Sequence, residues 1–221
     1  QAGNLQMPSC HRGLTMPGAV SAGAYTASVF DCLREALEEW EKRKRELRET
    51  VTAEADWDVP SHDVVIPVMS GASAGGIVEA LSVISLADQP APGTIPQKHT
   101  YTQVGTVTTN LPRLYNAWVK MPRFVAPDGG SGLLGTEDLA KGPVASLLDT
   151  TLLSKIVDKS FEDFKGPGPA RAYLAEEQHI FLTHTNLRGV PYEIGFKGGA
   201  KGQPGYAMMS HADRLHFVMT G

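Results

Sequence analysis

The segment VVIPVMSGASAGG, residues 64–76, constrains the fold more than any other part of the chain. Its first six residues are apolar and mostly β-branched, which is typical of a buried strand, and the residues after it have helical apolar spacing. Between them, GASAG at 71–75 fits G-x-S-x-G, the sharp strand-to-helix turn that exposes a nucleophilic serine. We therefore predict that Ser73 is a nucleophile and that Gly71 and Gly75 relieve crowding in the turn. A plain βα turn that contains a serine is the alternative.

A second glycine-rich segment, MPGAVSAGAY at 16–25, also lies between a short apolar piece and an amphipathic helix. If its strand neighbours the strand before Ser73, the backbone N–H groups near Gly18, Ala19 and Val20 would face the serine. Such amides form the oxyanion hole that acyl transfer requires. The alternative is a second tight turn without a chemical role.

The order of apolar patterns predicts the fold class. A helix is expected from about residue 23, and its charged second half, EKRKRELRET, is expected to project into solvent. Further helices are expected over 76–86 and 147–164, and strands at 180–185, 192–196 and 215–219, with a turn at 186–190 between the first two of these strands. The core face of the first helix is predicted to hold Val29, Cys32, Leu33, Ala36, Leu37 and Trp40. Strands that alternate with helices favour an α/β fold, a mostly parallel central sheet flanked by helices on both faces, within a single domain over 1–221.

Composition limits the partners and cofactors. The net charge of −4 does not favour nucleic acid as a partner. Two cysteines without metal-ligand spacing indicate neither a disulfide framework nor a metal site, and we expect no cofactor. No apolar run reaches the roughly 18 residues of a membrane span. The chain begins with Gln1 rather than Met, so a lost targeting segment stays open; a cytoplasmic or peripheral membrane location is favoured, and the oligomeric state is unknown.

With these two glycine-rich turns in this order, the chain resembles the patatin-like phospholipase family. HIFLTHTNLRGVPYEIGF at 179–196 and SLLDTTLL at 146–153 add to the resemblance, which spans about residues 14–218. It implies a three-layer α/β fold and a lipid acyl-ester hydrolase of the phospholipase A or lysophospholipase type. It also implies a Ser–Asp dyad with Ser73 as the nucleophile, no metal, a lipid substrate and transient contact with a membrane or micelle.

Two features depart from the family pattern. The family loop usually carries a basic residue where this chain has Ala22, so the backbone amides remain but an added positive charge does not. The family aspartate lies in a D-G-[GA] motif after the later strands. The one D-G-G here, Asp128-Gly129-Gly130, precedes them. We expect a domain that is incomplete at its C-terminus, with the catalytic aspartate beyond Gly221 and Asp128 as the candidate base within the chain.

Two other functions remain open. In a Ser-His-Asp carboxylesterase of the α/β-hydrolase type, a histidine and an acid would follow Ser73 in the chain. The candidates are His184, His211 and His216, with Asp149, Asp158 or Asp163. A catalytically inactive acyl-binding or interaction module is the second alternative. The intact serine turn argues against it, because a strained turn has a cost that a binding module has little reason to bear.

Overall fold

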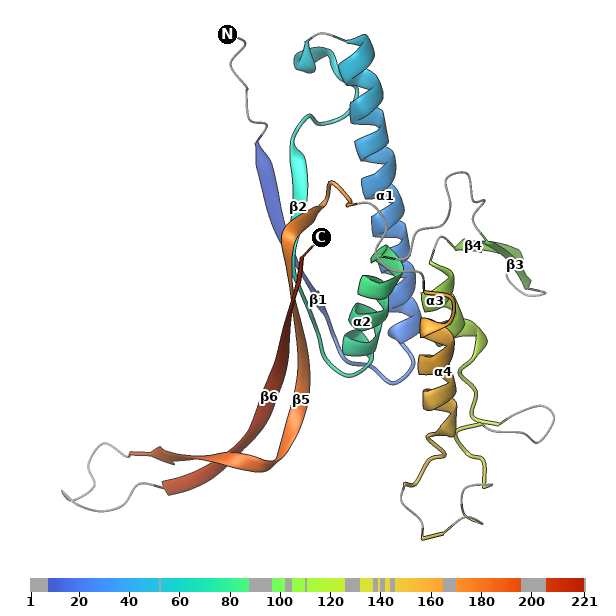
Figure 1. The fold of residues 1–221 in the computed structure, drawn as a ribbon, viewed down its shortest axis with the longest axis vertical. Coiled ribbons are helices and arrows are strands. Elements are labelled where there is room, and N and C mark those ends of the chain that lie inside the picture. The colour runs from blue at the N-terminus through green and yellow to red at the C-terminus, as the bar shows by residue number, and fades with distance from the viewer. Residues whose placement is uncertain are drawn as a thin grey trace.

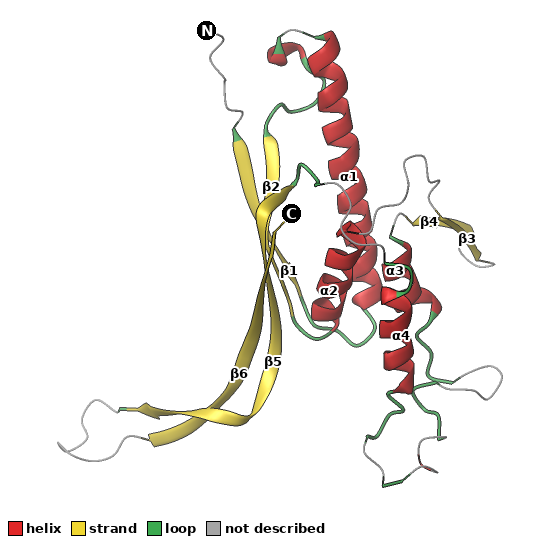
Figure 2. Cartoon of the chain, in the orientation of Figure 1, coloured by secondary structure: helices red, strands yellow, loops and turns green. Residues whose placement is uncertain are grey.

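The computed structural model has an α/β architecture in which a long twisted sheet lies beside a group of helices (Figures 1 and 2). The structure describes residues 8–51, 53–87, 97–101, 105–109, 111–125, 132–136, 139, 142–143, 146–164, 170–195 and 206–220. At 97–101 and 105–108 only the backbone is described.

The main sheet has four strands in the order β1-β2-β5-β6. These are β1 (Ser9–Met16), β2 (Asp63–Gly71), β5 (Leu174–Ile194) and β6 (Tyr206–Thr220). The first three run parallel, and β6 pairs antiparallel with β5. The predicted α/β class with a mostly parallel sheet is therefore confirmed. A separate antiparallel pair joins β3 (Gln97–Tyr101) and β4 (Gly105–Thr109).

The main helices all lie on one side of this sheet (Figure 1). They are α1 (Gly23–Thr50), α2 (Ala74–Ala87), α3 (Pro112–Tyr115) with the π-helical turn η2 (Asn116–Lys120), and α4 (Thr151–Phe161). Within the described chain, the expected helices on the opposite face, and hence the third layer, are not present. The reason is topological. The order β1-β2-β5 advances in one direction, and right-handed crossovers that advance in one direction place their helices on the same face.

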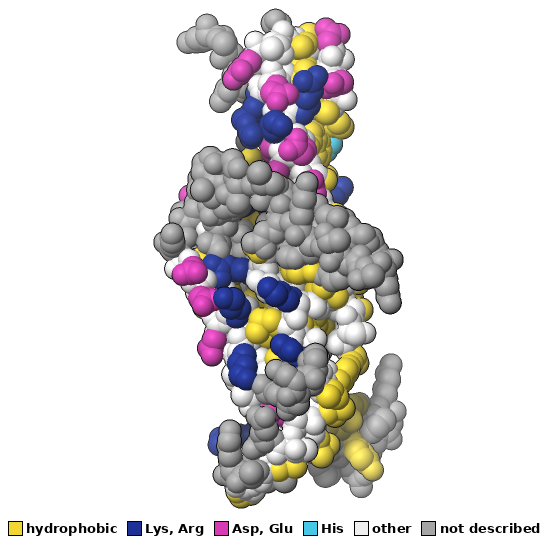
Figure 3. Space-filling view, turned by 90° about the vertical axis from the view of Figure 1, so that its right-hand side faces the viewer, with side chains coloured by type: hydrophobic (Ala, Val, Ile, Leu, Met, Phe, Trp, Pro, Cys, Tyr) yellow, Lys and Arg dark blue, Asp and Glu magenta, His cyan; other side chains and the backbone are white. Residues whose placement is uncertain are grey.

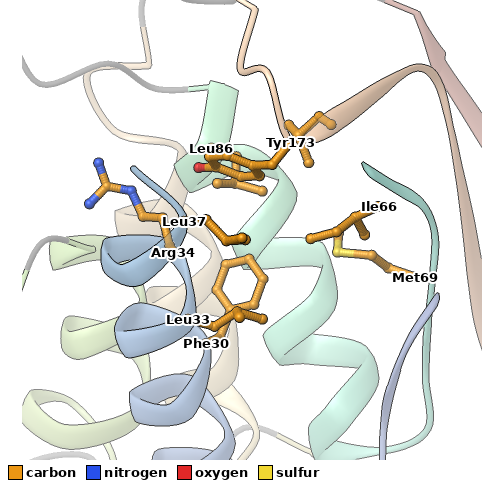
Figure 4. Close-up of a pocket in the computed structure, with 9 residues that line it drawn as sticks. Phe30, Leu33, Arg34, Leu37, Ile66, Met69, Leu86 and Tyr173 are labelled. Atoms are coloured by element: carbon orange, nitrogen blue, oxygen red, sulfur yellow. The ribbon is translucent and has the colours of Figure 1, made fainter. Parts of the chain in front are cut away.

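The hydrophobic core lies between α1, α2 and the sheet. Figure 4 shows Phe30 and Leu37 of α1 pointing toward Ile66 of β2, with Leu86 and Tyr173 above them around a small apolar cavity. All five side chains are buried. The helical layer and the sheet are thus joined by one continuous apolar contact that includes β2.

The buried stripe of α1 differs from the predicted one. Leu37 is buried as expected, but Val29, Cys32 and Ala36 are exposed. A charged residue takes part in the stripe instead: Arg34 is buried and forms an ion pair of 2.7 Å with Glu38 one turn later. Apolar spacing alone could not find this face, because it assumes that charged residues point to solvent.

The charged second half of α1 is not simply a solvated face. Acidic and basic side chains mix on the surface at that end (Figure 3), yet Lys44 is completely buried. Its ammonium group lies 2.6 Å from carboxylates of both Glu41 and Asp63. The segment that follows, with the 3₁₀ turn η1 (Glu54–Asp56), packs back on the helix through Arg43, which pairs with Asp58 at 2.8 Å.

The strands after α4 are longer than predicted. The expected strand at 180–185 and residues 192–194 of the expected strand at 192–196 belong to the single strand β5, while Phe196 lies outside the described residues. Between them, residues 186–190 form an irregularity in the ladder with β6. There, Asn186 Oδ1 accepts hydrogen bonds from the backbone N–H groups of Arg188 and Gly189, and Gly189 has a positive φ of 71°. The expected turn of the chain is therefore wrong: the local turn chemistry bends a continuous ribbon instead of ending a strand.

Candidate functional site

Ser73 lies at the turn between β2 and α2, as the sequence predicts. β2 ends at Gly71, α2 begins at Ala74, and the Ser73 carbonyl accepts the N–H of Ile77 at 3.1 Å. Ser73 is exposed and has φ = 53°, a left-handed conformation that is rare for a residue with a side chain. A non-glycine residue held in this region is typical of a strained functional turn.

The glycines around Ser73 are required by close backbone packing. A Cβ at Gly75 would lie 2.1 Å from the carbonyl oxygen of Met16 and 2.7 Å from that of Pro17. A Cβ at Gly71 would lie 2.5 Å from the carbonyl oxygen of Gly75. The N–H of Ala72 donates to the Met16 carbonyl at 3.2 Å. The serine turn is thus built directly against the end of β1, which holds it in a fixed geometry.

The predicted oxyanion loop lies beside the serine. A Cβ at Gly18 would be 3.1 Å from the Cβ of Ser73 and 3.2 Å from the carbonyl oxygen of Ala72. Within the described chain, the backbone N–H groups of Gly18, Ala19 and Val20 donate to no backbone carbonyl. Figure 1 shows the β1–α1 and β2–α2 loops next to each other at one end of the sheet. The structure therefore brings together the two segments that the sequence singled out.

A row of hydroxyls lies on the strands directly before the turn. Thr15 of β1 and Ser70 of β2 are register partners, and the Ser70 hydroxyl donates to Thr15 Oγ1 at 3.2 Å. On the other side, the Thr183 hydroxyl of β5 contacts the carbonyl oxygen of Gly71 at 3.5 Å. These contacts tie the end of β2 to both neighbouring strands. They are positioning contacts, since none of them involves the side chain of Ser73.

The candidate base Asp128 lies outside the described residues. The candidate histidines of a Ser-His-Asp triad all have other partners on the β5–β6 ribbon. His184 lies 3.5 Å from Asp213, His211 Nδ1 contacts the carbonyl of Asn186 at 2.8 Å, and His216 Nε2 contacts His179 Nδ1 at 2.9 Å. In the described part of the chain, no hydrogen bond joins a histidine to Ser73.

The candidate acids of that triad belong to α4 and its flanks. Asp149 is buried, and its Oδ1 accepts the N–H of Thr151 at 2.9 Å where the helix begins. Asp158 is exposed on α4, and Asp163 is exposed just after it with φ = 59°. No hydrogen bond links any of them to a candidate histidine among the described residues. The observed contacts therefore do not assemble a second catalytic constellation.

Glu79, on the helix that follows the serine turn, is a feature that sequence reasoning missed. It is the only charged residue of α2, it lies six positions after Ser73, and it is completely buried. Neither carboxylate oxygen has a hydrogen-bond partner in the described chain. Burial raises the pKa of Glu79 from 4.5 to about 7, and the nearby backbone of Phe181 offsets only part of this rise. The sequence does contain one signal for this buried acid, since Glu79 is the single charged residue in an otherwise largely apolar and uncharged helix.

Two searches of the described residues bear on cofactors and membranes. No group of three or more His, Cys, Asp or Glu side chains there could hold a metal ion. None of the helices described is both long enough and apolar enough to cross a bilayer. Neither observation identifies a ligand.

Comparison with known proteins adds one relative. The chain is 44% identical over 215 residues to an uncharacterised protein, y4iI, of Sinorhizobium fredii, and the match covers 97% of this chain. It covers 28% of that protein, so the chain spans little more than a quarter of the relative's length. No family model and no solved structure matches the chain. The relative's name assigns no activity, so a functional conclusion has to come from the site itself.

Proposed function

We propose that the chain is a serine acyl hydrolase of the patatin-like type that cleaves lipid acyl esters, as phospholipases A and lysophospholipases do. One observation carries the proposal. Ser73 is exposed and has a left-handed backbone conformation. Its turn packs so closely against the end of β1 and the β1–α1 loop that a side chain at Gly75 would clash with backbone carbonyls. A serine in such a turn, beside amides that donate to no backbone carbonyl within the described chain, has the geometry that nucleophilic acyl transfer needs.

The proposed reaction has two steps. Ser73 Oγ attacks the ester carbonyl carbon while a carboxylate accepts the hydroxyl proton, and the developing oxyanion receives hydrogen bonds from amides near Gly18, Ala19 and Val20. The tetrahedral intermediate expels the alcohol, which takes up the proton, and leaves an acyl ester on Ser73. Water, deprotonated by the same carboxylate, then releases the fatty acid and restores the serine. Asp128 is the proposed base within this sequence, and no metal or organic cofactor takes part.

Two helix N-termini would assist the oxyanion. α1 begins at Gly23, just after the β1–α1 loop, and α2 begins at Ala74, next to the nucleophile. The partial positive charge at each N-terminus stabilises a negative charge nearby, typically by about 0.3–1 kcal/mol. This field is present although the loop has Ala22 where a basic residue would add a full charge. The backbone alone thus supplies the electrostatic support in the proposed mechanism.

Labelling with a fluorophosphonate probe tests the proposal. The probe reacts with activated serines, so the wild-type chain should be modified on the peptide that contains Ser73. Ser73→Ala should lose both the label and ester hydrolysis, while Ser28→Ala, which changes an exposed serine on α1, should keep both. If the wild-type protein is folded but stays unlabelled and inactive, the chain is not an acyl hydrolase, and an acyl-binding module becomes the better proposal.

A further inference from the structure

Two histidines meet on the face of the main sheet that no described helix covers. His179 of β5 and His216 of β6 occupy diagonal positions in the antiparallel ladder, because the register partner of His216 is Phe181, two residues after His179. Leu182 faces α2, since its Cδ2 lies 3.6 Å from the position of a Cβ at Gly76. Side chains alternate along a strand, so His179 and Phe181 point to the other face, away from the helices of the described chain (Figure 1).

The two imidazole rings direct nitrogen atoms at each other. His179 Nδ1 lies 2.9 Å from His216 Nε2, and the ring planes are 21° apart. The Phe181 ring stacks on the His216 ring, with centroids 4.3 Å apart and planes 7° apart, which restricts the orientation of that histidine. His216 is exposed and His179 is half-buried, so an ion from solution has access to the pair.

The separation of these nitrogens fits two adjacent ligands of one metal ion. Metal–imidazole bonds are about 2.0–2.1 Å long, and two such bonds whose nitrogens lie 2.9 Å apart enclose an angle of about 90°. Neighbouring ligands of a tetragonal ion lie at this angle, whereas tetrahedral Zn²⁺ needs its ligands about 3.3 Å apart. Imidazole ligands in tetragonal geometry are typical of Cu²⁺, which also binds nitrogen ligands most tightly among the divalent first-row metals.

We propose that His179 and His216 form a binding site for Cu²⁺ on this face of the sheet. A neutral imidazole has one N–H and one lone pair, so in the bound state His179 carries its proton on Nε2 and His216 on Nδ1, and the two facing lone pairs bind the ion. The described residues contain no group of three ligating side chains, so water completes the coordination. The ion would join β6 to β5 through side chains as well as through the ladder. The site shares no residue with the serine turn, so it does not depend on the proposed function.

Titration of the metal-free chain with CuCl₂, followed by calorimetry and by electron paramagnetic resonance, tests the site. Wild type should bind Cu²⁺ with a tetragonal spectrum whose nitrogen couplings show two equatorial imidazoles. His179→Gln and His216→Gln should each weaken binding at least about tenfold, because the loss of even an outer-shell partner of a metal site costs about 10–100-fold in affinity. His184→Gln is the matched control. It changes an exposed histidine of β5 that lies 3.5 Å from Asp213, and it should bind Cu²⁺ within about twofold of wild type.

Thermal unfolding supplies a second readout. Cu²⁺ should raise the melting temperature of wild type and of His184→Gln more than that of His179→Gln or His216→Gln, because an ion that binds only the folded state stabilises it. If wild type binds no Cu²⁺, or if both variants bind it as wild type does, the proposal is wrong. A wild-type spectrum with a single imidazole overturns it even where a variant fails to fold. Ser73→Ala should bind Cu²⁺ like wild type, so the outcome for the proposed hydrolase is read separately, from probe labelling.

Discussion

The two ends of the β1–α1–β2 unit are built in opposite ways. At the Ser73 end, contacts are between backbones: Gly75 and Gly18 allow loops to approach until an added Cβ would clash or nearly so. At the opposite end, long side chains make the contacts. Lys44 pairs with Glu41 and Asp63, and the Trp40 indole N–H donates to the Pro60 carbonyl at 2.9 Å. Segments 13–23 and 64–78 at the first end contain no charged residue, and the second end contains most of the ion pairs of α1.

This difference has a functional consequence. Backbone contacts fix the turn without using the side chain of Ser73. Within the described chain, the amides of Gly18, Ala19 and Val20 donate to no backbone carbonyl, as the proposed reaction requires. At the opposite end, the polar side-chain atoms pair with one another or with backbone carbonyls, as Lys44 and Trp40 do. These atoms are therefore already engaged in hydrogen bonds and ion pairs. Two ionisable groups, Lys44 of α1 and Glu79 of α2, are completely buried and differ in their surroundings: Lys44 has two carboxylate partners, whereas Glu79 has no hydrogen-bond partner in the described chain.

The largest expected effect comes from filling the space at Gly75. In Gly75→Ala the new Cβ would lie 2.1 Å from a backbone carbonyl that cannot move without disturbing β1, so we expect a loss of more than about 3 kcal/mol in the free energy of unfolding. Urea denaturation measures it. Gly76→Ala is the control, because its Cβ would meet nothing closer than 3.4 Å and alanine favours a helix by about 0.5–1 kcal/mol. Equal effects of the two changes would show that the close packing of the turn is not what limits stability.

The second prediction concerns the unpaired Glu79. Its folded-state pKa of about 7 lies above the ordinary 4.5, so the folded protein binds the proton more tightly. The stabilising contribution is complete below pH 4.5 and is lost as the pH rises to about 7, a total of roughly 3 kcal/mol at about 1.4 kcal/mol per pH unit. Glu79→Gln should remove this dependence.

Urea unfolding at several pH values checks this, with the difference between Glu79→Gln and wild type as the quantity of interest. It should grow in favour of the variant between pH 4.5 and 7 and stay constant above. Glu49→Gln, at an exposed position on α1, corrects for the loss of one surface charge. A difference that does not change with pH would mean that Glu79 gains a partner in solution.

Lys44, the paired buried group, should show a smaller loss. Lys44→Met keeps the length of the stem but leaves Glu41 and Asp63 without their cation. Because the Asp63 side chain is 38% exposed and can regain water, we expect about 2 kcal/mol instead of the 3–5 kcal/mol of a fully buried pair. Lys42→Ala, which breaks an exposed pair with Glu39, should cost less than about 0.5 kcal/mol in the same denaturation experiment. If Lys44→Met and Lys42→Ala lowered the free energy of unfolding by similar amounts, the buried ion pairs of Lys44 would contribute no more to stability than an exposed pair.

The Ser73 end could be predicted from the sequence because its signals are local. G-x-S-x-G between an apolar strand and a helix defines the turn by the sizes of five neighbouring residues, and the structure places Ser73 as expected. The neighbouring loop followed from one assumption, that the two strands are adjacent, and the β1–β2 pairing confirms it. Whether Ser73 is catalytic, and whether Asp128 is its base, stays a prediction.

The remaining features depend on contacts between distant residues, which local patterns do not contain. Lys44 is buried because its partners make burial favourable, and they include Asp63, nineteen positions away. The order of elements along the chain also does not reveal the order of strands in the sheet. Because β1, β2 and β5 are added successively in the same direction, the helices that connect them lie on one face. The continuous β5 depends on its long ladder with β6, and the local turn signal at 186–190 could not reveal it.

The smallest predicted effect tests whether hydrogen bonding, and not aromatic bulk, holds the end opposite Ser73. Trp40→Phe keeps a ring near Lys44 but removes the donor to the Pro60 carbonyl, so we expect a loss of about 1 kcal/mol in the free energy of unfolding. Trp57→Phe is the matched control. Its indole nitrogen is buried without a hydrogen-bond partner in the described chain, so its removal should cost about 0.5 kcal/mol or less. If Trp57→Phe were the more damaging change, packing against Arg48 and not the indole hydrogen bond would be the main support of this end.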